Sequence, residues 1–153
     1  MITYKLQADN QRDYRVTSNG RVIYNAIRKQ RLLRGDKVFF YDDDNQLIAA
    51  SKHKFFLIVG FGHKVQFYND GFSTVLRPSK AQFSLLYGTD TYTLKYAWFS
   101  MNNNLYLNNM EEGTFKMLNQ TNLTYEAEFS CNSETSCKIF SMLYILQDWF
   151  TFN

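Results

Sequence analysis

The residues best suited to chemistry in this chain of 153 residues are three aspartates, two histidines and two cysteines. Asp42, Asp43 and Asp44 stand together and could bind a cation. A calcium-binding loop also needs a downstream glycine and a bidentate glutamate at fixed positions, and neither is present. We therefore interpret the three aspartates as a hairpin turn whose side chains accept hydrogen bonds from the backbone.

The histidines and cysteines lack the neighbours that catalysis or metal binding needs. His53 lies among lysines and His63 follows Gly60-Phe61-Gly62, so neither has a carboxylate at a spacing that would make a general base or a zinc site. Cys131 and Cys137 fit no metal-binding spacing, and we expect free thiols, with a redox role left open. The sequence thus predicts a protein that is not an enzyme and that holds no metal or cofactor.

Positive charge gathers in two places along the chain. Arg28, Lys29, Arg31 and Arg34 form one run with Lys37, and Lys52 and Lys54 form a second cluster around His53. Such residues could contact anionic lipid headgroups, each contributing about 1 kcal/mol near the surface. The alternative is a set of solvated loops whose charges protect sheet edges. The candidate contact residues for a lipid or a partner are Arg28, Lys29, Arg31, Arg34, Lys52 and Lys54.

The elements that must position these residues are predicted to be β-strands within one domain, residues 1–153. Aromatic residues make up 18% of the chain, and there is one proline. Phe and Tyr favour the pleated surfaces of sheets. The net charge of +3 is too small to indicate nucleic-acid binding.

A repeated unit of strand, turn, strand and basic loop organises the first half of the chain. "KVFFY" at residues 37–41 and "KVQFY" at residues 64–68 open two copies, 27 residues apart. Turns are predicted at Asn19-Gly20, at residues 42–45 and at residues 69–71, because Asn, Asp and Gly accept the backbone angles of tight turns. In an up-and-down meander, equivalent loops share one end, so the two basic clusters are expected to lie close together.

The second half continues as strands with weaker turns. We expect strands at residues 91–101, 105–109, 114–118 and 123–129, with turns at residues 102–104 and 111–113. About a dozen short strands of this kind predict a closed antiparallel barrel, which leaves no open sheet edge.

The C-terminal segment departs from this pattern and predicts a helix over residues 134–152. Ser133 is suited to cap its start, and Glu134 lies in the first turn, where the helix dipole favours an acid. A polar stripe is expected along Ser141, Tyr144 and residues 147, 148 and 151, while every other face is apolar. A helix with so much apolar surface needs burial around most of its circumference.

No secretory leader and no run of about 18 apolar residues is present, which predicts a cytoplasmic protein, peripheral at a membrane if it binds lipid. A meander followed by one hydrophobic helix resembles the tubby-like superfamily, which includes the tubby C-terminal domain, the phospholipid scramblases, the plant LURP-one-related proteins and small bacterial relatives. The resemblance rests on "VFFYDDDNQLIAASKHK", "VQFYNDGFSTVLRPSK", the degenerate copy "GRVIYNAIRKQ" and the terminal "KIFSMLYILQDWFTF". It covers most of the chain from about Arg15, and the chain looks like a small bacterial member.

The resemblance implies a twelve-stranded barrel threaded by the helix and a non-enzymatic role, with membrane or phosphoinositide binding in the tubby branch. The phosphoinositide-contacting residues of that branch match no positions here. We therefore expect a binding module that associates with anionic phospholipid through a basic rim. The alternatives are a structural or protein-interaction domain without a lipid ligand and a barrel that binds a small molecule among its aromatic residues.

Overall fold

The computed structural model describes residues 1–9, 13–29, 37–56, 60–68, 73–79, 82–95, 102–121 and 124–152. These residues form one helix, α1 (Glu134–Phe152), and twelve strands. The strands are β1 (Ile2–Asp9), β2 (Asp13–Ser18), β3 (Arg21–Lys29), β4 (Lys37–Asp42), β5 (Leu47–Phe56), β6 (Gly60–Phe67), β7 (Ser73–Ser79), β8 (Gln82–Tyr87), β9 (Asp90–Lys95), β10 (Asn102–Leu107), β11 (Met110–Gln120) and β12 (Thr124–Cys131).

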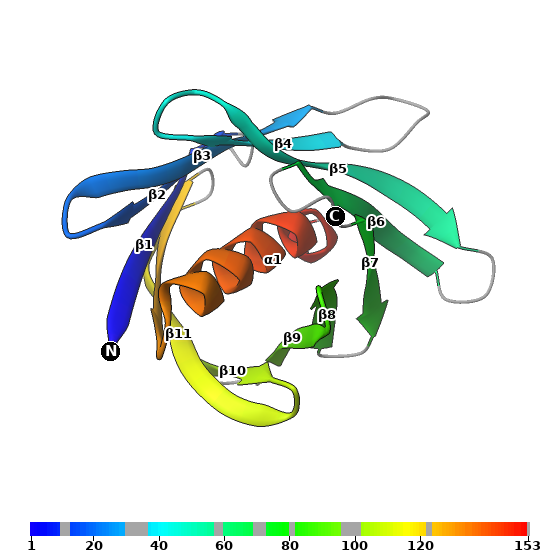
Figure 1. Ribbon diagram of the computed structural model, residues 1–153. Coiled ribbons are helices and arrows are strands. Elements are labelled where there is room, and N and C mark those ends of the chain that lie inside the picture. Colours follow the sequence, from blue (N-terminus) through cyan, green and yellow to red (C-terminus); the bar gives the residue numbers. More distant parts are fainter. Residues whose placement is uncertain are drawn as a thin grey trace.

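Each strand pairs antiparallel with its neighbours in the sequence. The first strand, β1, pairs with both β2 and β12, so the hydrogen-bonded order returns to its start and the strands form a closed barrel. The ribbon shows this ring of strands around α1 (Figure 1). The predicted mainly β, antiparallel architecture with a C-terminal helix is therefore confirmed.

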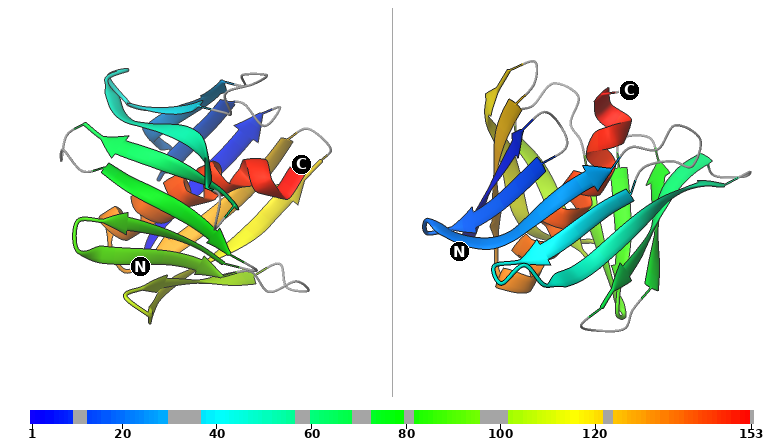
Figure 2. Two further views of the ribbon diagram at one scale, coloured as in Figure 1. Left: turned by 90° about the vertical axis from the view of Figure 1, so that its right-hand side faces the viewer. Right: turned by 90° about the horizontal axis from the view of Figure 1, so that it is seen from above.

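The barrel has two different ends. We call the end at which α1 begins the entry end; it carries the turns at residues 19–20, 43–46, 88–89 and 108–109. At the other end, the exit end, α1 reaches its last residue. The view from above shows the helix running from one end to the other (Figure 2).

The first two predicted hairpins are confirmed. Asn19 and Gly20 both have positive φ, 52° and 76°, between β2 and β3. Asn45, with φ of 60°, lies in the turn between β4 and β5. The third predicted turn, at residues 69–71, lies outside the described residues, although β6 and β7 on either side of it pair antiparallel.

The predicted turns of the second half are wrong in position. Residues 102–104 belong to β10 and residues 111–113 to β11. The chain instead turns at Asn108 and Asn109, both with positive φ of 51° and 68°, between the paired residues Leu107 and Met110. The predicted strand at residues 91–101 is described only as far as Lys95, the end of β9.

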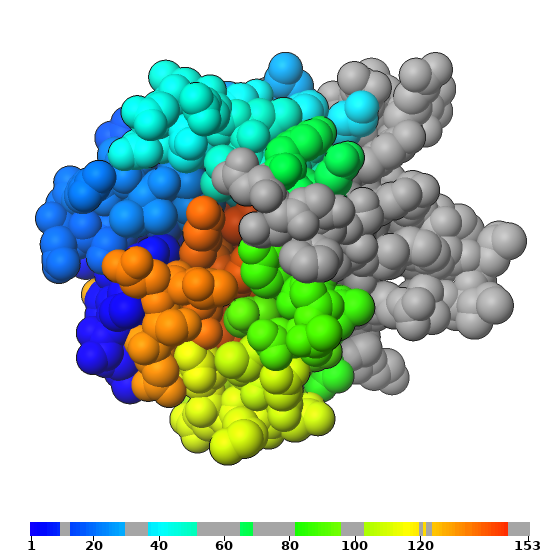
Figure 3. Space-filling view, in the orientation of Figure 1, coloured from blue at the N-terminus to red at the C-terminus, as the bar shows by residue number. Residues whose placement is uncertain are grey.

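Ser133 caps the helix as predicted. Its Oγ accepts a hydrogen bond from the backbone N–H of Ser136 at 3.1 Å, which satisfies a donor that the first turn would otherwise leave unpaired. From this cap α1 enters the barrel, and the space-filling view shows its first turns in orange at the entry end (Figure 3). Among the described residues, no helix combines the length and apolarity of a membrane span.

The interior is filled by the helix and by the inward side of the strands. Along β12, for example, buried residues alternate with partly exposed ones, as expected of a sheet with one face in the core. Aromatic rings join helix to sheet: the ring centroid of Tyr144 lies 5.2 Å from that of Phe115, and Phe140 lies 5.3 Å from Tyr92.

The expected polar stripe on the helix is not exposed where its side chains are described. Ser141 is buried and lies 2.6 Å from the Tyr24 hydroxyl, with which it forms a hydrogen bond. Tyr144 is also buried, and its hydroxyl donates to the Met117 sulfur at 3.8 Å. These residues reach the core because each finds a polar partner there, which offsets the cost of removing a hydroxyl group from water.

Candidate functional site: a lysine row on the outer face

The two basic clusters predicted from the sequence belong to one end of the barrel. In an antiparallel meander the chain leaves β3 and β5 at the same end, which here is the exit end. Lys29 is the last residue of β3, and Lys52 and Lys54 lie in the second half of β5. Arg31 and Arg34 lie outside the described residues, and so do the side chains of Lys52 and Lys54.

Strand register aligns four lysines across four adjacent strands. Lys29 is directly opposite Lys37, Lys37 opposite Lys52, and Lys52 opposite Lys64. We call Lys29, Lys37, Lys52 and Lys64 the lysine row. Neighbouring strands are about 4.8 Å apart, so the row extends for about 14 Å across β3, β4, β5 and β6.

Lys29 and Lys37 of the lysine row lie on the outer face of the barrel. Their sequence neighbours Arg28 and Val38 are buried, and successive residues of a strand point to opposite faces. Lys29 is exposed and Lys37 partly exposed. Within the described part of the chain, neither forms an ion pair.

Across β1, β12 and β11, the charges on the outer face alternate in sign. Lys5 of β1 is directly opposite Glu128 of β12, which is opposite Lys116 of β11. The Lys116 Nζ lies 3.8 Å from a Glu128 carboxylate oxygen. Like charges placed directly opposite each other destabilise a sheet, so an uninterrupted lysine row costs stability that the alternating row does not.

An apolar row lies next to the lysines on the same face. Ile27, Phe39 and Ala50 are consecutive register partners, two residues along from Lys29, Lys37 and Lys52 on their strands. Ile27 is 38% exposed, and the Lys29 Nζ lies 5.4 Å from the centroid of the Phe39 ring. A partly exposed aliphatic and aromatic surface bordered by ammonium groups is amphipathic.

Arg28 is not part of this surface, and its prediction as a contact residue is wrong. The residue is only 4% exposed, because it lies on the inward side of β3. Its guanidinium donates hydrogen bonds to the carbonyl of Ile145 in α1 and to the Tyr14 hydroxyl. Arg28 therefore links the barrel wall to the enclosed helix. The prediction failed because a run of basic residues in the sequence does not show which of them point inward.

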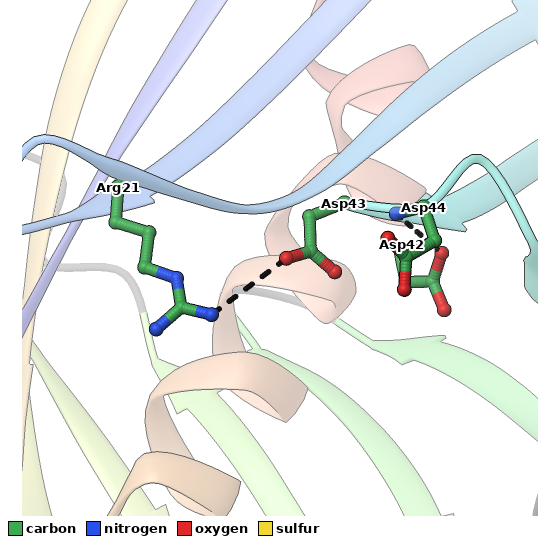
Figure 4. Close-up of polar contacts among 4 residues, drawn as sticks. All are labelled: Arg21, Asp42, Asp43 and Asp44. Atoms are coloured by element: carbon green, nitrogen blue, oxygen red, sulfur yellow. Dashed lines mark hydrogen bonds and ion pairs between the residues drawn. The ribbon is translucent and has the colours of Figure 1, made fainter.

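The three aspartates form the turn that their sequence predicts. Asp42 Oδ1 accepts hydrogen bonds from the backbone N–H groups of Asp44 and Gln46, both at 2.9 Å. Asp43 forms an exposed ion pair with Arg21 at 3.8 Å (Figure 4). The carboxylates lie within 4.8 Å of one another, but Asp42 holds the β4–β5 turn and Asp43 pairs with Arg21 of β3.

The histidines and cysteines take positions that the sequence left open. His53 and His63 are directly opposite each other in the β5–β6 ladder. Cys131 and Cys137 are free and buried, with the Cys137 thiol donating to the backbone carbonyl of Ile2 at 3.3 Å. A hydrogen bond with Cys137, together with burial, raises the pKa of Cys131, so its thiol stays protonated at neutral pH.

Comparison with known proteins supports the fold. Neither a family model nor a curated protein matches the sequence. A crystal structure of a protein from Arabidopsis thaliana is similar to this chain with a TM-score of 0.59, over 97% of this chain and 92% of that chain. The two sequences are 11% identical, so the likeness concerns the fold alone.

Proposed function

We propose that this protein is a non-enzymatic binding module that associates with anionic phospholipid through the lysine row. The observation that carries the proposal is the register of Lys29, Lys37, Lys52 and Lys64, which lines up four positive charges without an intervening carboxylate. A linear array of ammonium groups complements a surface on which phosphate groups are dense.

The apolar row favours a membrane surface, and not a free phosphate compound, as the binding partner. Ile27 and Phe39 lie beside the lysines, where a membrane would place its acyl chains next to its headgroups. A free phosphate compound would bind the charged groups but would leave this apolar surface uncovered. Interfacial binding strengthens with both buried apolar area and attraction to anionic lipid.

We also propose that the chain is a tubby-like protein. An antiparallel ring of strands in sequence order around one C-terminal helix agrees with what the resemblance implies, and this agreement supports the assignment. A location at the cytoplasmic surface of a membrane follows from the proposed lipid binding. The other candidate contact residues, Arg31, Arg34 and Lys54, would extend the positive surface towards the exit end.

Liposome sedimentation tests the lipid proposal. The wild type is expected to sediment with vesicles that contain phosphatidylserine and to stay in solution with phosphatidylcholine alone. The Lys29→Glu/Lys37→Glu variant is expected to bind at least roughly thirtyfold more weakly, because two lysines contribute about 2 kcal/mol near such a surface. Added salt should weaken wild-type binding, since it screens exposed charges.

A matched control is available on the opposite side of the ring. Lys95 of β9 and Lys116 of β11 are both exposed, and the Lys95→Glu/Lys116→Glu variant makes the same change in net charge. This variant should retain most of the binding. Equal loss in the two variants would show that only net charge matters, and an absence of wild-type binding would refute the proposal in favour of a protein-interaction domain.

A further inference from the structure

A small cavity remains inside the entry end of the barrel although α1 occupies the interior. Its volume is about 130 Å³, and it is partly open to solvent. From the strands it is lined by Ile48, Phe67 and Tyr87. We call this cavity the mouth pocket.

The helix contributes the other wall of the mouth pocket. Thr135, Lys138, Ile139 and Met142 line the pocket, and their spacing places them on one face of α1. Among the described residues, α1 packs most closely against β1, β8, β9 and β12. The helix therefore lies off-centre, and the space is left on the side of β5 and β6.

The inner walls of the mouth pocket are apolar and aromatic. Ile48, Phe67, Ile139 and Met142 are buried residues of the core. The ring centroids of Phe67 and Tyr87 are 4.8 Å apart in an edge-to-face arrangement. The cavity is close in size to an engineered apolar cavity of about 150 Å³ that binds benzene, so it has room for one small ring.

The rim of the mouth pocket carries a positive charge. Lys138 is partly buried at the pocket and forms no ion pair with any described residue. Thr135, one turn earlier in α1, adds a hydroxyl group. Glu134 also lies in the first turn but does not line the pocket, so Lys138 is the one charged residue among the lining residues.

We infer that the mouth pocket binds a small monocarboxylate whose body is a single aromatic ring or a short branched chain. The apolar body packs between the Phe67–Tyr87 pair and the helix face formed by Ile139 and Met142. The carboxylate accepts a charge-assisted hydrogen bond from the Lys138 ammonium group. This site lies inside the entry end of the barrel, whereas Lys29 and Lys37 of the lysine row lie on the outer face near the exit end, and it does not depend on lipid binding.

Methyl NMR of the wild type with sodium benzoate tests the site. Shifts are expected at the methyl groups of Ile48, Ile139 and Met142, with Ile27 on the outer face and exposed Met110 as internal controls that stay unchanged. A ligand of this size should have a Kd on the order of 1 mM. An absence of shifts in the pocket at about 20 mM benzoate would overturn the inference.

A charge variant tests the role assigned to Lys138. In Lys138→Met, the affinity for benzoate should fall by about tenfold, because a charge-assisted hydrogen bond is lost. The affinity for neutral benzyl alcohol should be unchanged, which also shows that the variant is folded with an intact cavity. An equal loss for both ligands, or no loss for benzoate, would contradict the assigned role.

Discussion

Replacing Lys37 with glutamate should make the free protein more stable while it weakens lipid binding. Lys37 lies between Lys29 and Lys52 in the lysine row, so Lys37→Glu turns two repulsive cross-strand pairs into two attractive ones. Each directly opposed pair of opposite charges is worth about 0.2–1 kcal/mol, and like charges cost a similar amount. With screening by solvent, we expect a gain of about 1 kcal/mol, which corresponds to a rise in Tm of about 2–4 °C for a chain of this length.

Thermal unfolding at low and high salt measures this effect. The gain in Tm for Lys37→Glu should be largest at low ionic strength and shrink at about 1 M salt, where the Debye length is only about 3 Å. Lys5→Glu provides the opposite control, because Lys5 faces Glu128 and its reversal creates a repulsive pair. A loss of stability in Lys37→Glu, or a gain that salt does not reduce, would refute the like-charge reasoning from register.

Three further predictions concern the barrel interior. Gly113→Ala should lower the free energy of unfolding by about 1–3 kcal/mol in urea titrations, because the added Cβ would lie 2.1 Å from the Ser130 carbonyl oxygen; an unchanged midpoint would contradict this close approach. Tyr24→Phe should cost about 1 kcal/mol in the same assay, since it removes the hydrogen bond to Ser141, and it should leave lipid binding intact. Burial raises the pKa of Tyr4 from 10.0 to about 12, so the stability that the protonated Tyr4 contributes is complete below pH 10 and is lost as the pH rises towards 12. In denaturation curves measured across this pH range, Tyr4→Phe should show a smaller loss of stability than the wild type. An equal loss in both proteins would rule Tyr4 out as its source.

The repeated unit in the sequence includes two lysines of the candidate site that the prediction from charge runs left out. "KVFFY" and "KVQFY" each begin with a lysine, Lys37 and Lys64, and these are the members of the lysine row that were absent from the predicted contact residues. Register places Lys52 between them, because β5 pairs with β4 on one side and with β6 on the other. A comparison of equivalent positions in the two copies of the repeat could have identified both lysines, whereas local charge density did not.

The turns show where local patterns are sufficient and where they are not. Asn19-Gly20 was predicted correctly because both residues tolerate positive φ, which is a local property. Three asparagines at residues 102–104 and two at residues 108–109 are equally suited to turns by composition, and only the pairing of β10 with β11 selects the second. Local conformational preference is nearly the same at both sites, so the choice is made by long-range strand pairing.

The sequence alone determined that the chain forms strands joined by turns and ends in a helix too apolar to remain in water. Alternation of apolar residues, turn-forming residues and the Ser133 cap are local features, and each acts through a few neighbouring residues. Tertiary structure alone decided that Arg28 points inward to the helix, that four lysines align, and that α1 lies off-centre and leaves the mouth pocket. These outcomes depend on how strands distant in the sequence are paired and on how side chains fill a common interior, and neither is encoded in any single segment.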